Sequence, residues 1–208
     1  MSGHAETLAF SAKAGKREAG TRERLLHAAA AVIQDGGWTS ASVGAIAKRA
    51  GVAAGTLYRH FDSKADLFVE VFRAVSHREM SAMRTAEIGT TSFAERFDAI
   101  VRTYADRALR NRRLAWALVY EPLDAAVDRE RLTYRRAYSE GMAALIRQGI
   151  ASKTIPNQDA DLAAAAVVGV IAESLVGPLS PVARETTPDA AIVAAIVTFC
   201  RRVIGLPG

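Results

Sequence analysis

Apolar residues recur along most of the chain with the 3.6-residue period of an α-helix, and no segment alternates apolar and polar residues with a period of two. The sequence therefore predicts an all-α fold. Four short helices are expected in its first part, because Ser and Thr residues stand where N-caps are needed and glycines where helices stop. The expected caps are Thr21, Ser42 and Ser63, the expected stops are Gly36 and Gly51, and the third helix is expected to start near Ala54.

Longer helices are expected beyond residue 90. Ser92 and Glu95 have the spacing of a capping box, and apolar residues then repeat on one face over about 18 residues. The later helices are expected over residues 114–120, 130–150, 161–176 and 189–204. We divide the chain into a flexible tail (residues 1–20), an N-terminal three-helix unit (residues 21–67) and a larger helical unit (residues 68–208).

The composition of the 208 residues is that of a soluble protein in a reducing compartment. Cys200 is the single cysteine, so no disulfide can form within one chain. The longest apolar run, residues 162–172, falls short of the roughly 18 residues that cross a membrane, and no signal-peptide pattern precedes it. We therefore predict a cytoplasmic protein with no membrane partner.

Charge is a weaker guide to function. The net charge of +5 permits an anionic partner, and residues 1–75 carry 10 Lys and Arg against 7 Asp and Glu, a net charge of +3. Many basic proteins bind no nucleic acid, however, so this excess requires support from a motif.

A helix-turn-helix pattern runs through residues 42–60. Two helices that cross closely need a small residue at the crossing, a glycine in the turn and an apolar anchor on the second helix. Ala47, Gly51 and Leu57 meet these needs at the right spacing. An ordinary αα-corner in a helical bundle is the alternative interpretation.

The residues that follow favour DNA. The second helix is expected to expose Thr56, Tyr58, Arg59 and His60, and Lys64 opens the next helix, where a phosphate would also meet free backbone N–H groups. One short helix in a major groove reads only a few base pairs, so two copies of the chain are expected on a useful site. A helical adaptor that binds protein instead of DNA is the alternative function, although such a helix would more often present an apolar stripe.

The stretch GGWTSASVGAIAKRAGVAAGTLYRHFDSKADLF resembles the DNA-binding domain of the TetR family of transcriptional regulators. The resemblance implies a homodimer on a pseudo-palindromic double-stranded DNA operator, and a C-terminal domain that dimerises and binds a small-molecule effector. The DNA-binding residues that it implies are Ser42, Ala54, Gly55, Thr56, Tyr58, Arg59, His60 and Lys64. Many members carry hydroxyls where this chain has Ala41 and Ala53, and Arg59 with the basic tail residues Lys13, Lys16 and Arg17 is a candidate replacement for the lost phosphate contacts.

The later helices are expected to enclose the effector. Large aromatic side chains suit the walls of an apolar pocket, although each is as well explained as plain core. The predicted ligand-binding residues are Trp116, Tyr120, Tyr138, Met142 and Glu173. Glu173 either is a buried carboxylate that anchors a ligand or faces solvent. Drug, lipid, flavonoid and acyl-type ligands all fit this description.

Two further assignments follow from the charged and small residues. The arginines at positions 129, 131, 135 and 136 are expected on a solvated helix face, because opposite charges are interspersed among them. The helices at 161–176 and 189–204 are expected to pair with their copies in a dimer, as in the TetR family, with Ala163 to Ala166 and Gly169 allowing close approach. Burial within one chain is the alternative.

Effector and operator are then expected to oppose each other, with repression the favoured outcome. The sequence shows none of the usual local signatures of catalysis, and its histidines and Cys200 form no ligand cluster. We therefore predict no enzyme activity, no catalytic residue, no metal and no cofactor.

Overall fold

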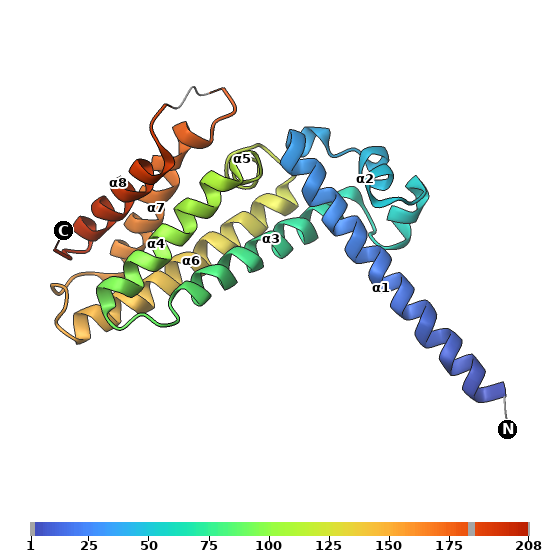
Figure 1. The fold of residues 1–208 in the computed structure, drawn as a ribbon, viewed down its shortest axis with the longest axis horizontal. Coiled ribbons are helices and arrows are strands. Elements are labelled where there is room, and N and C mark those ends of the chain that lie inside the picture. The colour runs from blue at the N-terminus through green and yellow to red at the C-terminus, as the bar shows by residue number, and fades with distance from the viewer. Residues whose placement is uncertain (1–2, 183–185, 208) are drawn as a thin grey trace.

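The computed structural model describes residues 3–182 and 186–207, with the backbone alone for residues 3–19, and this part of the chain is helical without a strand. The predicted all-α fold is confirmed (Figure 1). The α-helices are α1 (Gly3–Gly36), α2 (Val43–Ala50), α3 (Lys64–Ala86), α4 (Phe93–Arg110), α5 (Arg112–Val119), α6 (Ala125–Ala151), α7 (Ala160–Leu179) and α8 (Asp189–Val203). Two short 3-10 helices, η1 (Trp38–Ser40) and η2 (Ala54–Arg59), flank α2.

Helix α1 begins at Gly3, so the prediction that Thr21 caps the first helix is wrong, and residues 3–20 are helical instead of forming an irregular tail. Two physical reasons account for the difference. Residues 3–20 contain no proline and many strong helix formers, which outweigh the cost of about 1 kcal/mol for each interior glycine. The Thr21 hydroxyl accepts a hydrogen bond from the Arg24 guanidinium (3.1 Å), a residue one turn later. The side chains of Lys13, Lys16 and Arg17 lie outside the described residues.

The other predicted caps are confirmed. The hydroxyls of Ser42 and Ser63 accept hydrogen bonds from the third backbone N–H of α2 and α3, and Gly51 ends α2 in the left-handed conformation at φ 68°. Ser92 and Glu95 form the expected capping box of α4, which is 18 residues long as predicted.

One buried cluster joins the N-terminal helices to the rest of the molecule. Leu25, Ile33, Ile46, Leu57 and Phe68 form its centre. Residues of α5 and α6 belong to the same cluster, namely Leu114, Ala117, Val127 and Tyr134. Helix α3 continues unbroken across the predicted boundary between residues 67 and 68, so the N-terminal unit and the larger unit share both a helix and a core.

A second cluster fills the larger unit between α4, α6, α7 and α8. Phe97, Val101 and Ile146 are fully buried there. In α8 the buried residues are Val193, Ile196, Val197 and Cys200, whereas Phe199 is 53% exposed. Helices α7 and α8 lie at the end of the molecule opposite α2 (Figure 1).

Helix α7 is a longer apolar segment than the run of residues 162–172 noted in the sequence. Residues 160–179 are long and apolar enough to cross a membrane by length and composition. It packs beside α6 and α8 in the second cluster, and one such helix is weak support for a membrane protein because core helices share these properties. The helix ends at Leu179, three residues beyond the predicted end at Val176, and Pro178 lies in its last turn.

Candidate functional site

The helix-turn-helix residues lie where their spacing predicted. Ala47 and Leu57 are buried, and Gly51 makes the turn between α2 and η2. The N–H of Val52 donates to the carbonyl of Ala47 (3.0 Å) and closes that turn. The predicted short helix, however, is a 3-10 helix, and its N-cap residue Ala53 supplies no side-chain cap. Without that cap, i→i+3 bonds satisfy part of the first turn, as in the bond from Thr56 N–H to the Ala53 carbonyl (2.9 Å).

The 3-10 geometry decides which side chains share a face. With three residues per turn, residues three apart lie directly above one another. His60 therefore follows the row of the buried Leu57 and is itself half-buried. Tyr58 is 57% exposed and stands on a row with the exposed Gly55, and Arg59 is exposed on the row of Thr56. Tyr58 and Arg59 are thus the long side chains that project from η2.

Ser42 and Lys64 lie at the N-termini of the two flanking helices. The exposed Ser42 hydroxyl accepts from the Ala45 N–H (3.1 Å), which leaves its proton available to a phosphate. The Lys64 ammonium lies 5.0 Å from the centre of the Phe68 ring, a cation–π contact that holds the lysine beside the start of α3. Both positions combine free backbone N–H groups with a side-chain donor, which suits an anion.

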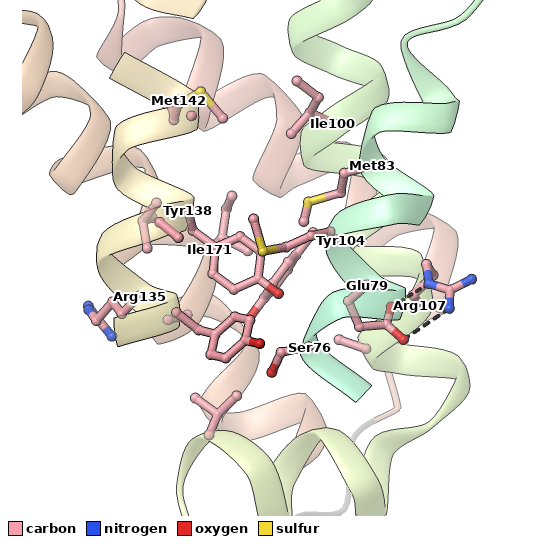
Figure 2. A pocket seen from close by; sticks show the side chains of 18 of the residues that line it. Ser76, Glu79, Met83, Ile100, Tyr104, Arg107, Arg135, Tyr138, Met142 and Ile171 are labelled. Atoms are coloured by element: carbon pink, nitrogen blue, oxygen red, sulfur yellow. Dashed lines mark hydrogen bonds and ion pairs between the residues drawn. The ribbon is translucent and has the colours of Figure 1, made fainter. Parts of the chain in front are cut away.

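An elongated cavity of about 500 Å³ lies between α3, α4 and α6 (Figure 2). Its wall follows α3 from Phe72 to Glu87, about 22 Å of helix at roughly 1.5 Å per residue. Helix α5 contributes Leu114, Ala115 and Leu118 at the end that faces the N-terminal helices. Met80, Met83 and Met142 all line the cavity, and such flexible side chains adapt to ligands of different shape.

Two of the five predicted ligand-binding residues, Tyr138 and Met142, line this cavity. Trp116 and Tyr120 do not; their rings pack against each other, and the Tyr120 hydroxyl donates to the Ala172 carbonyl. Glu173 also lies outside the lining and is exposed, so the premise that it is a buried carboxylate is wrong. The part that any of these five residues plays in ligand binding stays a prediction.

Sequence reasoning missed the polar residues of the wall. Ser76, Glu79, Tyr104 and Arg107 lie around the same space as Tyr138 in Figure 2. Arg107 pairs with Glu79 through two guanidinium nitrogens, one of them at 2.9 Å. The available signal was a polar residue interrupting an apolar stripe, since Ser76 directly follows the buried Val75 and is only 6% exposed.

The two phenols stay protonated in this surrounding. Burial raises the pKa of Tyr104, and the nearby Glu79 carboxylate adds to this while Arg135 opposes it. Burial likewise raises the pKa of Tyr138, with Tyr104 and Glu79 acting in the same direction. The rings of Tyr104 and Tyr138 meet edge to face with centroids 5.9 Å apart. Both side chains are therefore neutral hydroxyl donors at physiological pH.

Helix α5 connects the cavity to the turn before α2. While one side of α5 lines the cavity, the Trp38 indole N–H donates to its Ala117 carbonyl (2.8 Å) and the Trp38 backbone N–H donates to Glu121 (3.1 Å). Arg113 pairs with Glu121 and also donates to the Gly36 carbonyl (3.0 Å). Gly37, at φ 75°, leaves no room for a β-carbon beside the Arg113 guanidinium.

Arg131 belongs to this junction and not to a solvated face. Its guanidinium donates to the carbonyls of Leu118 (2.8 Å) and Glu121 (2.9 Å), which satisfies backbone acceptors at the C-terminal end of α5. The prediction of a solvated arginine cluster is thus wrong for Arg131, while Arg129, Arg135 and Arg136 are exposed as expected.

Two parts of the sequence match models of known protein families. Residues 25–71 match "Bacterial regulatory proteins, tetR family", and residues 90–175 match "Tetracyclin repressor-like, C-terminal domain". The transcriptional repressor KstR of Mycobacterium tuberculosis is 41% identical over 73 residues, which are 35% of this chain and 33% of KstR. The transcriptional activator FasR of Mycolicibacterium smegmatis is 38% identical over 85 residues, which are 41% of this chain and 39% of FasR. The chain thus spans only a third to two fifths of the length of these relatives.

A solved structure shows the same fold over nearly the whole chain. The regulator FadR of Bacillus subtilis in complex with stearoyl-CoA superimposes with a TM-score of 0.74 at 20% identity. The superposition covers 89% of this chain and 99% of that one.

Proposed function

Because the chain belongs to the TetR family of bacterial regulatory proteins, we propose that it binds a pseudo-palindromic operator as a homodimer and is released by a small apolar effector. The observation that carries the proposal is the exposed face of η2. Tyr58 and Arg59 project from it beside two helix N-termini with phosphate donors, Ser42 and Lys64. This arrangement combines base-edge contacts in a major groove with backbone contacts that position the helix.

The dimer is supported by the outer surface of α7 and α8. Leu162 is 69% exposed and Phe199 is 53% exposed, and small residues at positions 165 and 166 are exposed on α7 as well. Exposed apolar side chains on two neighbouring helices suit contact with a second copy. Of the small residues predicted at this interface, Ala163 and Ala164 are buried within the chain and do not contribute to its surface.

The effector would occupy the cavity between α3, α4 and α6. Its apolar wall follows 15 residue steps of α3, from Phe72 to Glu87, which suits a long or bulky apolar molecule. The FadR structure with stearoyl-CoA supports a ligand with a long apolar part. Because α5 lines the cavity on one side and holds Trp38 on the other, an effector that displaces α5 would move the turn that leads into Ser42 and α2. Operator and effector would then oppose each other by the same factor in both directions.

We favour repression as the outcome. A dimer that covers a promoter excludes polymerase without any further contact surface, whereas activation requires one. The relatives include both a repressor and an activator, so the regulatory sign rests on this steric argument. A protein that binds an operator would work in the cytoplasm, with the chromosome.

Selection of genomic DNA tests the proposal without any knowledge of operator or effector. Purified protein is mixed with fragments of its own genome at about 0.15 M salt, and the retained DNA is sequenced. We expect an enriched pseudo-palindrome that is lost with Tyr58→Ala and retained with Ile88→Ala, a control at another exposed apolar residue. No enrichment at any salt concentration would overturn the proposal and favour a protein-binding adaptor.

A further inference from the structure

We propose that the effector carries an uncharged, hydrogen-bond-accepting oxygen, such as the carbonyl of a ketone, ester or thioester, which the hydroxyls of Ser76, Tyr104 and Tyr138 hold inside the cavity. This inference rests on the proposed function, because it names the chemistry of the molecule that the regulator would sense. It assigns the three hydroxyls as determinants of ligand specificity.

The first observation is that these hydroxyls have no partner. Among the residues that the structure describes, none of the three donates or accepts a side-chain hydrogen bond, and neither does Tyr134, a further phenol on the same wall. Serine in a helix often bonds the carbonyl four residues earlier, as Thr85 does with Ser81 (3.0 Å), but Ser76 does not. No described protein group occupies these hydroxyls, so they are available to an acceptor that enters the cavity.

The second observation is that the hydroxyls open onto the cavity. The Ser76 side chain is only 6% exposed. In the described residues, the fully buried side-chain polar atoms without a hydrogen-bond partner belong to Asp98, Arg113 and Arg201, so the Ser76 oxygen keeps some accessible surface. The same holds for both phenols. Because all three residues line the cavity, the space that their oxygen atoms reach is the cavity itself (Figure 2). Neutral hydroxyls donate, and a carbonyl oxygen has two lone pairs that accept from two donors at once.

The third observation is the local charge balance. Glu79, the carboxylate that acts on both Tyr104 and Tyr138, is bonded to the guanidinium of Arg107. Arg135, the cation that acts on Tyr104, also lines the cavity, but its side chain is exposed, so water hydrates its charge. A ligand charge buried beside the phenols would lose its own hydration and gain only this solvated counter-ion, which favours an uncharged oxygen.

The remaining wall fixes what surrounds that oxygen. Met80, Met83, Ile100 and Ile171 line the space around the hydroxyls. An apolar ligand without the oxygen would displace water from the hydroxyls and leave them unpaired, whereas one with the oxygen reproduces those bonds. The oxygen therefore decides between ligands of the same shape.

Three probes of similar shape test the inference by calorimetry: 2-acetylnaphthalene, which has a carbonyl, 2-ethylnaphthalene, which has none, and 2-naphthoate, which is anionic. The Tyr104→Phe/Tyr138→Phe variant keeps both rings and removes both hydroxyls. We expect it to bind 2-acetylnaphthalene about 10-fold more weakly than the wild type and 2-ethylnaphthalene equally well or better. Ser76→Ala should weaken the ketone about 3-fold, whereas Ser81→Ala, the same change at an exposed position of α3, should not.

The infrared carbonyl band of the bound ketone gives an independent readout. It should lie at lower frequency in the wild type than in the double variant, because a hydrogen bond weakens the carbonyl bond. Equal loss of the ketone and the hydrocarbon, an unshifted band, tighter binding of 2-naphthoate than of the ketone, or no binding of any probe would each overturn the inference. None of these results involves DNA, so they leave the genomic selection to decide the proposed function separately.

Discussion

At the scale of single residues, the 3-10 geometry of η2 separates two neighbours that the sequence treats alike. Tyr58 projects from the helix-turn-helix unit (residues 42–60, called the head below), whereas His60 shares the row of the buried Leu57. We expect Tyr58→Ala to lower operator affinity at least 10-fold and His60→Ala to lower it less than about 3-fold. Fluorescence anisotropy with the selected operator measures both. Equal losses would mean that η2 winds differently on DNA, and unchanged melting temperatures would show that both variants are folded.

Lys64 belongs to a different class of contact. A lysine at a helix N-terminus binds phosphate without reading sequence, so Lys64→Gln should weaken all operator variants by a similar factor. The slope of log affinity against log salt should fall in magnitude by about 1. Lys153→Gln, an exposed lysine at the end of α6, is the matched control. A loss confined to some operator sequences would instead assign Lys64 to base recognition.

The sequence predicted the head better than the cavity for a physical reason. Ala47, Gly51 and Leu57 act within one short stretch, where spacing alone fixes which residues meet. The cavity instead depends on which faces of three long helices come together, and local periodicity does not contain that information. Tyr104 lies seven residues after Phe97 on the same helix, and nothing in the local sequence shows that Phe97 fills the core while Tyr104 lines the cavity.

At the scale of elements, the junction between α5 and the turn before α2 should carry a measurable share of stability. The Arg113 and Glu121 side chains are 28% and 16% exposed, so breaking their pair leaves a largely buried charge. We expect Glu121→Gln to cost about 2 kcal/mol of unfolding free energy and to weaken operator binding, with Arg113→Met/Glu121→Gln no worse than additive. Urea unfolding measures the stability. Asp161→Asn, which breaks an exposed pair with Arg147, should cost less than about 0.5 kcal/mol; a similar cost for both would remove the junction's special role.

A second set of contacts, between α1, α3 and α6, gives a pH dependence. Burial acts to raise the pKa of Glu70, but hydrogen bonds from Arg22 and Arg73 outweigh it and hold that pKa below its ordinary value of 4.5. Because this pKa is lower in the folded than in the unfolded protein, the Glu70 carboxylate stabilises the fold at pH values above the unfolded-state pKa. This stabilisation is lost as the pH falls through the folded-state pKa. Because all three side chains are about a third to a half exposed, Glu70→Gln should cost less than about 1 kcal/mol at pH 7.

Urea unfolding of wild type and Glu70→Gln at several pH values checks this sign. The difference between the two proteins should shrink below about pH 4, where the wild-type carboxyl also becomes protonated. A difference that stayed constant down to pH 3 would mean that the side chain contributes through packing and not through its charge.

Helix periodicity located nearly every element, but in α8 it does not show which apolar stripe is buried. The structure buries the stripe through Val193 and Cys200, while Phe199 is 53% exposed. Both stripes are apolar because α8 has apolar surface to cover on two sides. A sequence cannot state whether such a stripe meets its own chain or a second one.

At the scale of the whole molecule, that uncovered stripe leads to a prediction about assembly. Helices α7 and α8 expose Leu162 and Phe199 at the end of the molecule opposite the head, so a dimer through this surface would leave both heads free to reach successive major grooves. Leu162→Glu/Phe199→Glu buries two carboxylates in such an interface without disturbing either core cluster. We expect the variant to sediment as a single chain and to bind the operator at least 100-fold more weakly, because each head alone reads only a few base pairs.

The matched control for assembly is Ile88→Glu, which introduces the same charge at a residue that is 79% exposed in the turn after α3. It should remain dimeric and bind normally. If Leu162→Glu/Phe199→Glu and Ile88→Glu sedimented alike but differed in operator affinity, the dimer contact would lie elsewhere. If Leu162→Glu/Phe199→Glu stayed dimeric with full affinity, the apolar surface of α7 and α8 would need a different occupant, and the spacing of the two heads would have to come from another face of the molecule.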